Sequence, residues 1–298
     1  MRALWITCLL LPSCCPTLVG SHPGDAGDLN WTKNDLPTPS STPPRIIDCG
    51  GKEIGSLGIR TSHTVVRDCI IKGNVRIWGP ARNASGPKLV TQSRSPDYVK
   101  WIRANSPTGV LIEDTTIIAT GSIPLYVGPG VTFTTLRRVS LRGPSSSTMI
   151  YLGAESYGTT IESSLIDAHQ AAREAVAIDA SSHNLLRSNA IQHNHGGVYL
   201  YRNCGEGGTI RHTTPSFNTI VDNVFTGDQI AIYVGSREGS RCYCQEDQGF
   251  PFGSSISDMD HARFNIVRGN ALGEGRIEVG KHATDNQIKG NQLASLHR

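Results

Sequence analysis

Acidic residues and histidines follow short aliphatic runs in the second half of the chain. One run is followed by Asp167 and His169, the next by His193 and His195, and a third by Asp228. A histidine can act as a general base near neutral pH, and a neighbouring carboxylate can orient it. A base of this kind could remove the proton next to the carboxylate of an acidic sugar.

Arginines accompany these groups. Arg202 and Arg237 end two successive runs. A guanidinium group binds a carboxylate through two hydrogen bonds and can stabilise the charge that develops when the proton leaves. Epimerisation or β-elimination would follow from that intermediate. We therefore predict catalytic roles for Asp167, His169, His193, His195, Asp228 and Arg202.

Other interpretations of the same residues stay open. A hydrolase would use paired carboxylates, such as Asp167 with Asp179 or Asp228. His193 and His195 could instead hold a metal ion, but we assign no metal ligands. No cofactor is assigned either, although calcium is considered. All of these groups could also be polar turn residues of a structural repeat.

Tyrosines alternate with aliphatic residues in the adjoining runs, as in Val198-Tyr199-Leu200-Tyr201 and Ile232-Tyr233-Val234. An exposed tyrosine offers a sugar both a flat apolar face and a hydroxyl group. The preference of tyrosine for β-strands is the competing explanation. We predict that the substrate is held by Tyr199, Tyr201, Tyr233, Arg237 and Asp179.

The elements that must position these residues repeat along the chain. Four octads carry asparagine at positions one and six and an apolar residue at positions three and eight. They start at residues 184, 218, 265 and 286, and degenerate copies start at residues 64, 110, 134 and 159. Four of the seven steps between octads are 21 to 25 residues long, a period typical of solenoids. The longer steps imply a missed repeat or inserted loops.

Each repeat has the alternation of β-strands, and none has room for a long amphipathic helix. Positions three and eight are an odd number apart, so the chain must turn between them. We expect the turn at the position-six asparagine, since asparagine tolerates left-handed dihedrals. Stacked amides could also bond from coil to coil. The pattern predicts an all-β, parallel β-helix of about eight coils.

This pattern resembles the right-handed parallel β-helix repeats of the pectate-lyase-like superfamily over residues 46–298. The resemblance implies a right-handed helix. It also implies activity on polysaccharides as a lyase, glycoside hydrolase or C5-epimerase, or else a non-catalytic adhesin or tailspike role. Asp167-Ala168-His169 is similar to the Asp-Pro-His-Asp motif of β-helical mannuronan C5-epimerases. Ala168 replaces the proline of that motif, and Gln170 replaces its final acid.

The N-terminal residues predict export. Residues 1–20 have a short basic start and an apolar stretch, which is typical of a cleaved signal peptide. Residues 21–45 are rich in proline, serine and threonine and are expected to form a linker. No later segment could span a bilayer. We expect a secreted or periplasmic protein.

Five cysteines follow the signal peptide, and an oxidising compartment should pair them. Cys49 with Cys69 is one plausible pair, and Cys204 with Cys242 or Cys244 is another. A thiolate metal site around the last three cysteines is the alternative.

These observations lead to one functional hypothesis and one alternative. We expect a monomeric, carbohydrate-active protein that acts on an extracellular, acidic polysaccharide by lyase, epimerase or hydrolase chemistry. The alternative is a non-catalytic glycan-binding or adhesive β-helix. A net charge of +3 and the lack of a basic run argue against a nucleic-acid partner.

Overall fold

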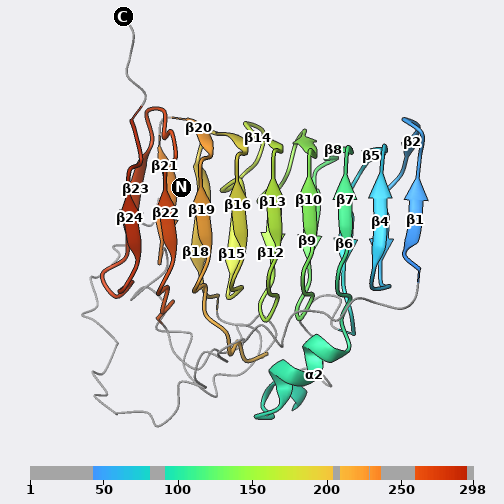
Figure 1. Ribbon diagram of the computed structural model, residues 1–298, viewed down its shortest axis with the longest axis horizontal. Coiled ribbons are helices and arrows are strands. Elements are labelled where there is room, and N and C mark those ends of the chain that lie inside the picture. The colour runs from blue at the N-terminus through green and yellow to red at the C-terminus, as the bar shows by residue number, and fades with distance from the viewer. Residues whose placement is uncertain (1–42, 81–90, 204–208, 228, 236–258, 294–298) are drawn as a thin grey trace, which may run out of the picture.

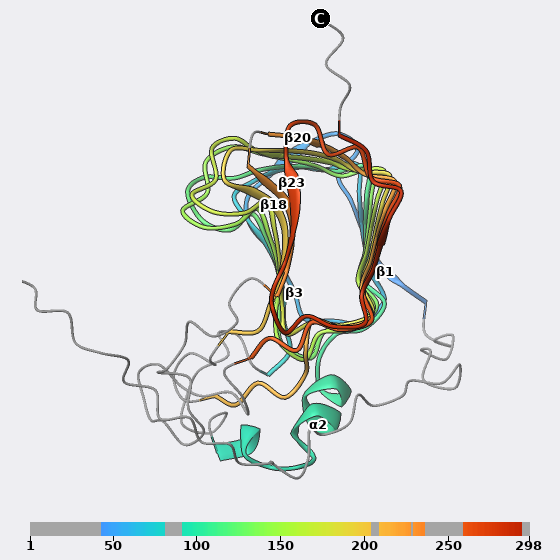
Figure 2. The same cartoon turned by 90° about the vertical axis from the view of Figure 1, so that its left-hand side faces the viewer.

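Three parallel β-sheets run the length of the molecule, and the chain visits them in turn in successive coils (Figures 1 and 2). The computed structural model describes residues 43–80, 91–203, 209–227, 229–235 and 259–293. In these ranges sheet A has nine strands, sheet B seven and sheet C eight. The predicted right-handed parallel β-helix of about eight coils is confirmed.

The strands are short. Those of sheet A are β1 (Arg45–Asp48), β4 (Thr64–Arg67), β7 (Leu111–Glu113), β10 (Thr135–Arg137), β13 (Thr160–Glu162), β16 (Leu185–Arg187), β19 (Thr219–Val221), β22 (Ile266–Arg268) and β24 (Gln287–Lys289). Those of sheet B are β2 (Glu53–Ile54), β5 (Ile70–Lys72), β8 (Thr116–Ile118), β11 (Ser140–Arg142), β14 (Leu165–Ala168), β17 (Ala190–His193) and β20 (Val224–Thr226). Those of sheet C are β3 (Leu57–Ile59), β6 (Val75–Ile77), β9 (Leu125–Val127), β12 (Ile150–Leu152), β15 (Val176–Asp179), β18 (Gly196–Tyr201), β21 (Ile230–Val234) and β23 (Arg276–Val279).

The two apolar positions of each octad fill the inside of the stack. Position three lies on sheet A and position eight on sheet B. In the coil of Asn184 these are Leu186 and Ile191, both fully buried. Each buried aliphatic side chain stabilises the fold by about 1.5–3 kcal/mol. Stacking like residues from coil to coil therefore builds one continuous core.

The corner between sheets A and B departs from our expectation. The left-handed backbone conformation occurs at position five of the octad rather than at position six. Ser188 and Asp222, for example, both have φ of 54° at this position. Serine, aspartate and glycine therefore take the turn, and the asparagine prediction was wrong. The asparagine follows the turn with its side chain directed inward.

Those asparagines form two hydrogen-bonded ladders, as the stacked-amide interpretation predicted. The amide of Asn189 donates to Oδ1 of Asn223 at 2.9 Å, and the amide of Asn223 donates to Asn270 at 3.0 Å. The second ladder contains the position-one asparagines, with Asn184 donating to Asn218 at 2.8 Å. Each buried amide also bonds to backbone groups, so the polar atoms of these asparagines are satisfied.

The long steps between octads are inserted loops rather than missed coils, because every octad supplies consecutive strands of sheet A. The first insertion carries the short helix α2 (Tyr98–Ala104), which the sequence pattern did not indicate. The stack also starts one strand before the first octad, at β1. The predicted signal peptide and residues 21–42 of the linker lie outside the described residues.

One disulfide ties the first two coils together. Cys49 and Cys69 are bonded, as predicted, across 20 residues of sequence. Cys204, Cys242 and Cys244 lie outside the described residues, so their pairing stays a prediction. Among the residues that the structure places, no helix is long and apolar enough to cross a membrane.

Candidate functional site

A row of aromatic residues crosses the outer face of sheet C, on the side of the stack opposite sheet A (Figure 2). Strand pairing puts one outward residue from each coil in register. In order along the stack, this tyrosine row consists of Arg76, Tyr126, Tyr151, Ala177, Tyr199, Tyr233 and Glu278. Tyr199 and Tyr233, two of the predicted substrate-binding residues, therefore lie in one row, and Ala177 rather than Asp179 takes the position of β15 in it.

The tyrosines of this row contact one another in pairs. Tyr126 and Tyr151 stack with an interplanar angle of 7° and a centroid distance of 5.4 Å. Tyr199 and Tyr233 meet edge to face at 5.6 Å. The ring of Tyr199 leans over Gly196, where a Cβ atom would lie 2.5 Å from it. Burial, followed by the charge of Glu174, raises the pKa of Tyr199 to about 12, so its hydroxyl stays protonated at neutral pH.

A buried polar network lies beside the middle of the row. The Tyr151 hydroxyl donates to Oδ2 of Asp179, and the Arg211 guanidinium lies 3.2 Å from the same oxygen. The backbone N–H of Asn203 donates to the other carboxylate oxygen at 2.7 Å. Asp179 is fully buried, so these partners replace the water that it loses on folding. Burial and the charge of Asp179 raise the pKa of Tyr151 well above its usual value.

Glu155 holds Arg211 in this network. Its buried carboxylate accepts the backbone N–H groups of His212 at 2.8 Å and of Thr213 at 3.1 Å. The Thr213 hydroxyl donates to the carbonyl oxygen of Ala180, one residue after Asp179. The segment that carries Arg211 is therefore fixed next to the ion pair, by bonds to residues that follow β12 and β15.

Tyr201 lies under a turn that leads from sheet B to sheet C. Its hydroxyl donates to Glu174 at 3.0 Å, and Arg173 contacts both groups. Tyr201 and Asp179 are each 0% exposed. Neither of these two predicted substrate-binding residues is open to solvent, whereas Tyr199 and Tyr233 reach the outer face.

Some of the predicted catalytic residues come together at the turns from sheet B to sheet C. Nδ1 of His169 lies 2.9 Å from Asp167, and both side chains are more than a third exposed. The amide of Asn194, from the next coil, donates to the carbonyl oxygen of His169 at 2.8 Å. A pocket of about 530 Å³ adjoins them and extends to Glu274. This arrangement can orient an imidazole as a base.

Two other predicted residues do not join this pair, although His193 lines the same pocket from below. His193 is 1% exposed, packs edge-on against Phe225 and lies beneath Gly227, so it fills the core under the pocket. Arg202 follows the far end of β18, six residues of extended chain from Gly196, or roughly 20 Å from the histidine turn. Its buried guanidinium donates to the carbonyl oxygen of Met259 at 2.7 Å.

The expected cluster of histidine, arginine and carboxylate is therefore divided between the two ends of sheet C, because Arg202 is turned toward the backbone at one end while His169 lies at the other. His195 is exposed at the turn, and its carbonyl oxygen accepts the hydroxyl of Tyr199 at 3.4 Å. Asp228 and Arg237 lie outside the described residues. In the part of the chain that the structure describes, no three metal-ligating side chains form a group.

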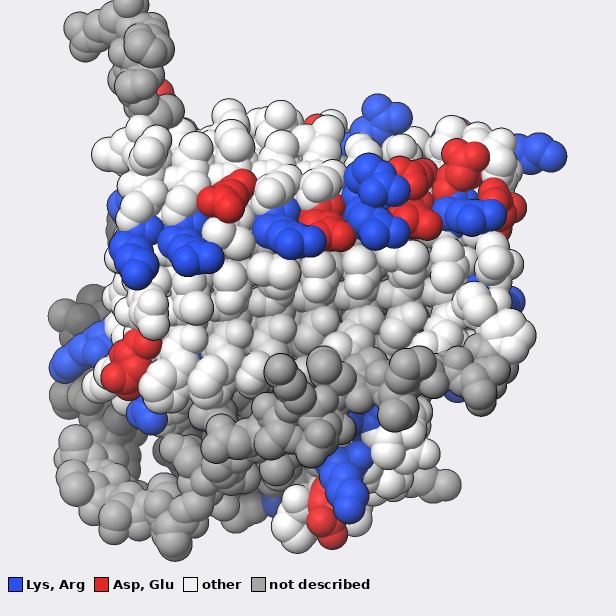
Figure 3. Space-filling view, viewed as in Figure 1, with Lys and Arg blue, Asp and Glu red and all other residues white. Residues whose placement is uncertain are grey.

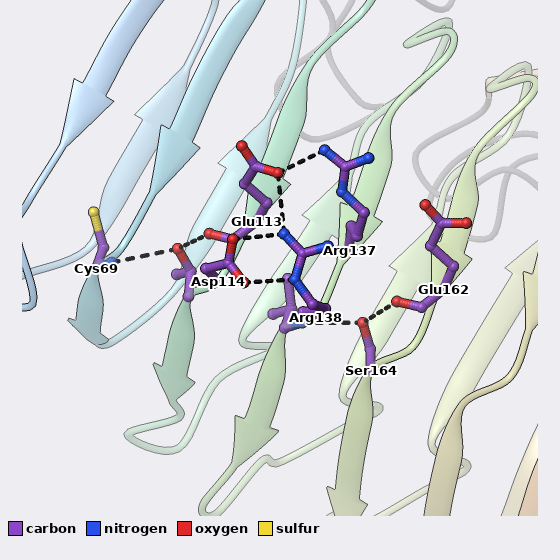
Figure 4. A network of polar contacts seen from close by, with 9 residues as sticks. Cys69, Glu113, Asp114, Arg137, Arg138, Glu162 and Ser164 are labelled. Carbon is purple, nitrogen blue, oxygen red and sulfur yellow. Dashed lines mark hydrogen bonds and ion pairs between the residues drawn. The ribbon is translucent and has the colours of Figure 1, made fainter.

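Sheet A carries charge rather than aromatic residues on its outer face. Figure 3 shows a row of alternating basic and acidic side chains across this face. Pairing between coils neutralises most of it, as with Arg137 and Glu113 at 2.6 Å and Arg138 and Asp114 at 2.7 Å (Figure 4). These paired ions are the cross-strand contacts expected of a solvated sheet.

Sequence reasoning did not assign Glu174, Glu155 or Arg211 to the site, although Arg211 lies close to the predicted loop arginines in sequence. They come from turns and insertions whose course the octads do not encode. Trp78 and Arg76, which extend the aromatic surface toward the first coils, were also missed. Arg76 pairs with Tyr126 on the neighbouring strand, so aligning the strand sequences one coil before Tyr126 could have identified it.

Comparison with solved structures supports the fold. The periplasmic alginate epimerase AlgG superposes with a TM-score of 0.50 and 11% identity, over 82% of this chain and 50% of that one. Two other structures have lower TM-scores. The Azotobacter vinelandii mannuronan C-5 epimerase AlgE4 A-module has a TM-score of 0.34 and 15% identity, over 85% of this chain and 79% of that one. The Escherichia coli bacteriophage HK620 tailspike in complex with a pentasaccharide has a TM-score of 0.35 and 10% identity, over 81% of this chain and 39% of that one.

The chain thus spans about half the length of AlgG. No protein-family model matches the sequence, and no curated protein matches it significantly. Identities of 10–15% carry information about the fold alone. The chain is a right-handed parallel β-helix protein.

Proposed function

We propose that this protein is a carbohydrate-active β-helix that holds an extended polysaccharide along the tyrosine row of sheet C. The observation that carries the proposal is the register of four outward tyrosines, Tyr126, Tyr151, Tyr199 and Tyr233, on one face of one sheet. The seven residues of the row lie on successive strands about 4.8 Å apart, so the row is roughly 29 Å long, enough for several consecutive sugar units.

The chemistry of the row suits a sugar chain. Tyrosine rings supply apolar area together with hydroxyl groups, and neighbouring rings restrict their motion. The structure that superposes with a TM-score of 0.50 is named as an alginate epimerase. The disulfide between Cys49 and Cys69 favours a secreted or periplasmic location, where such a polymer would be met. We retain the expectation of an acidic polymer.

Catalysis at the same face is the second candidate, and the Tyr151–Asp179–Arg211 network favours it. A phenol can donate its proton to a leaving oxygen, and the nearby charge of Arg211 would stabilise the phenolate that remains. The Asp167–His169 pair could supply a base for lyase or epimerase chemistry. A hydrolase would need a second carboxylate near Asp179, and in the described residues Glu174 is bonded to Tyr201 instead.

Binding is tested first with the full-length chain, by affinity electrophoresis in gels containing acidic or neutral polysaccharides. Tyr199→Ala combined with Tyr233→Ala should weaken binding about tenfold or more, as expected for aromatic residues central to an interface. The matched control is Phe264→Ala, which removes an aromatic side chain that is 45% exposed away from sheet C. Equal effects of the two variants would contradict binding along the row.

Catalysis is tested on the same polymers by unsaturated-product absorbance, reducing ends and uronate epimer content, with and without calcium. Tyr151→Phe keeps the ring stacked on Tyr126 and removes only the hydroxyl. We expect this variant to retain binding and to lose turnover if the network is catalytic. Full turnover in Tyr151→Phe would exclude its hydroxyl as the proton donor.

A further inference from the structure

Two arginines lie over aromatic rings at the N-terminal end of the tyrosine row. The guanidinium carbon of Arg60 is 5.8 Å from the centre of the Trp78 ring, and that of Arg76 is 5.5 Å from the centre of the Tyr126 ring. A guanidinium group over an aromatic face is stabilised by a cation–π interaction and loses much of its freedom to rotate. Two cations are therefore held on adjacent coils of one surface.

A glycine makes this arrangement possible. Gly58 pairs with Arg76 in the register of sheet C, and a Cβ atom at Gly58 would lie 2.6 Å from the Trp78 ring. The indole thus lies against β3 at a position where any side chain would displace it. Arg60 follows β3 two residues after Gly58, on the same outward side of the sheet, and its guanidinium group lies over the indole.

The two arginines differ from those of sheet A in what they contact. Arg67, Arg137 and Arg187 each bond to a carboxylate on the neighbouring coil. Within the described residues, neither Arg60 nor Arg76 forms an ion pair. Stacking on a ring uses the flat face of a guanidinium group and leaves the N–H groups at its edge available for an anion.

We propose that Arg60 and Arg76, supported by Trp78 and Tyr126, form an anion subsite that binds charged groups of the polysaccharide at the N-terminal end of the row. This inference rests on the proposed function, since it places the subsite at one end of the same binding surface. The planar guanidinium group of arginine matches the two oxygens of a carboxylate better than the compact ammonium group of lysine does. A sulfate ester offers similar oxygens, so the test includes both anions.

The experiment measures affinity of the full-length chain for polygalacturonate, for its methyl-esterified form, for dextran sulfate and for dextran. Arg60→Gln with Arg76→Gln should lower the affinity for polygalacturonate about tenfold and leave the affinity for the esterified polymer unchanged. Arg60→Lys with Arg76→Lys keeps the charge but not the fork, and should recover only part of the loss. Arg67→Gln with Arg137→Gln removes the same charge from sheet A and is the control.

Each outcome decides between the two proposals. Selective loss for polygalacturonate supports a carboxylate subsite, and selective loss for dextran sulfate assigns the subsite to sulfate instead. A wild-type protein that binds charged and uncharged polymers equally through its tyrosines overturns the anion subsite and leaves the proposed function standing. An equal loss in the sheet A control also overturns it, because net charge would then explain the effect. Binding to none of the polymers overturns both proposals.

Discussion

Tyr151 donates its hydroxyl proton to Asp179 on the next coil, and that carboxylate is fully buried. Arg211 completes the contact from an inserted segment, itself held by the Glu155 carboxylate. Polar side chains on the outer face of a β-helix are ordinarily hydrated, so a buried network of this kind is not required for the fold. The network therefore marks the middle of sheet C as the place where the fold departs from plain repetition.

Removing the cation of this pair should destabilise the protein strongly. Arg211→Met leaves the buried charge of Asp179 without its counter-ion, which should lower the free energy of unfolding by about 3–5 kcal/mol. Arg187→Met is the matched control, because Arg187 pairs with Glu162 while 54% of its side chain is exposed. That loss should stay below about 1 kcal/mol. Urea unfolding followed by circular dichroism measures both, and similar losses would contradict a structural ion pair.

The asparagine ladders should be strongest in their interior. Asn223→Ala removes bonds to Asn189, Asn270 and the carbonyl oxygen of Leu186 in a buried corner. We expect a loss of about 3 kcal/mol or more, since several buried partners are left unsatisfied. Asn291→Ala, at the last rung, should cost about 1 kcal/mol. Equal losses for the two variants in urea unfolding would show that an interior rung stabilises the protein no more than the last one.

Acid should weaken the protein through His183, which lies in a stack of aromatic rings between Tyr157 and Phe217. Burial, followed by the charge of Arg103, lowers the pKa of His183 from 6.5 to about 4. The folded state therefore binds a proton less readily than the unfolded state. The stability contributed above pH 6.5 should be lost as the pH falls from 6.5 to 4.

His183→Phe keeps a ring in the stack, and Phe217 already adopts the same left-handed backbone with φ of 59°. The variant should lose less stability than the wild type over that pH range, by on the order of 2 kcal/mol once partial exposure of the ring is considered. Unfolding free energies measured at pH 7 and pH 4.5 for both proteins give the comparison. Parallel pH profiles would assign the acid sensitivity to other groups.

The disulfide should stabilise the first coils. Replacing Cys49 and Cys69 together with alanine opens a loop of 20 residues, for which chain entropy predicts a loss of about 3 kcal/mol. Thermal unfolding of the variant should match that of the reduced wild-type protein. A variant as stable as the oxidised protein would show that the disulfide contributes nothing to stability.

The octads predicted the fold because each of them encodes a complete corner with its two flanking strands. Leu186 and Ile191 were placed correctly on two buried sheets, since a period of two applies within each short strand. The left-handed corner was misplaced by one residue. Asparagine and serine both tolerate that conformation, and only the ladder contacts of Asn189 show that its side chain is needed inside.

The candidate site was less predictable. The repeat explains why His169 and Asn194 lie next to each other, because both follow strands of sheet B in successive coils. It could not show that Arg202 turns toward Met259 or that Arg211 reaches Asp179. Those contacts depend on insertions between coils, where no repeat constrains the path of the chain.

Solenoids generally fray from their ends, because a terminal coil has only one neighbour. Here the first two coils are joined by a covalent bond and the last four by two amide ladders. The coils between them have single hydroxyl bonds at the same corners, such as Ser164 accepting the N–H of Val139. The coils with the lowest local stability should therefore lie in the interior of the stack. In a hydrogen-exchange experiment, the amides of β7 to β12 should exchange before those of either end.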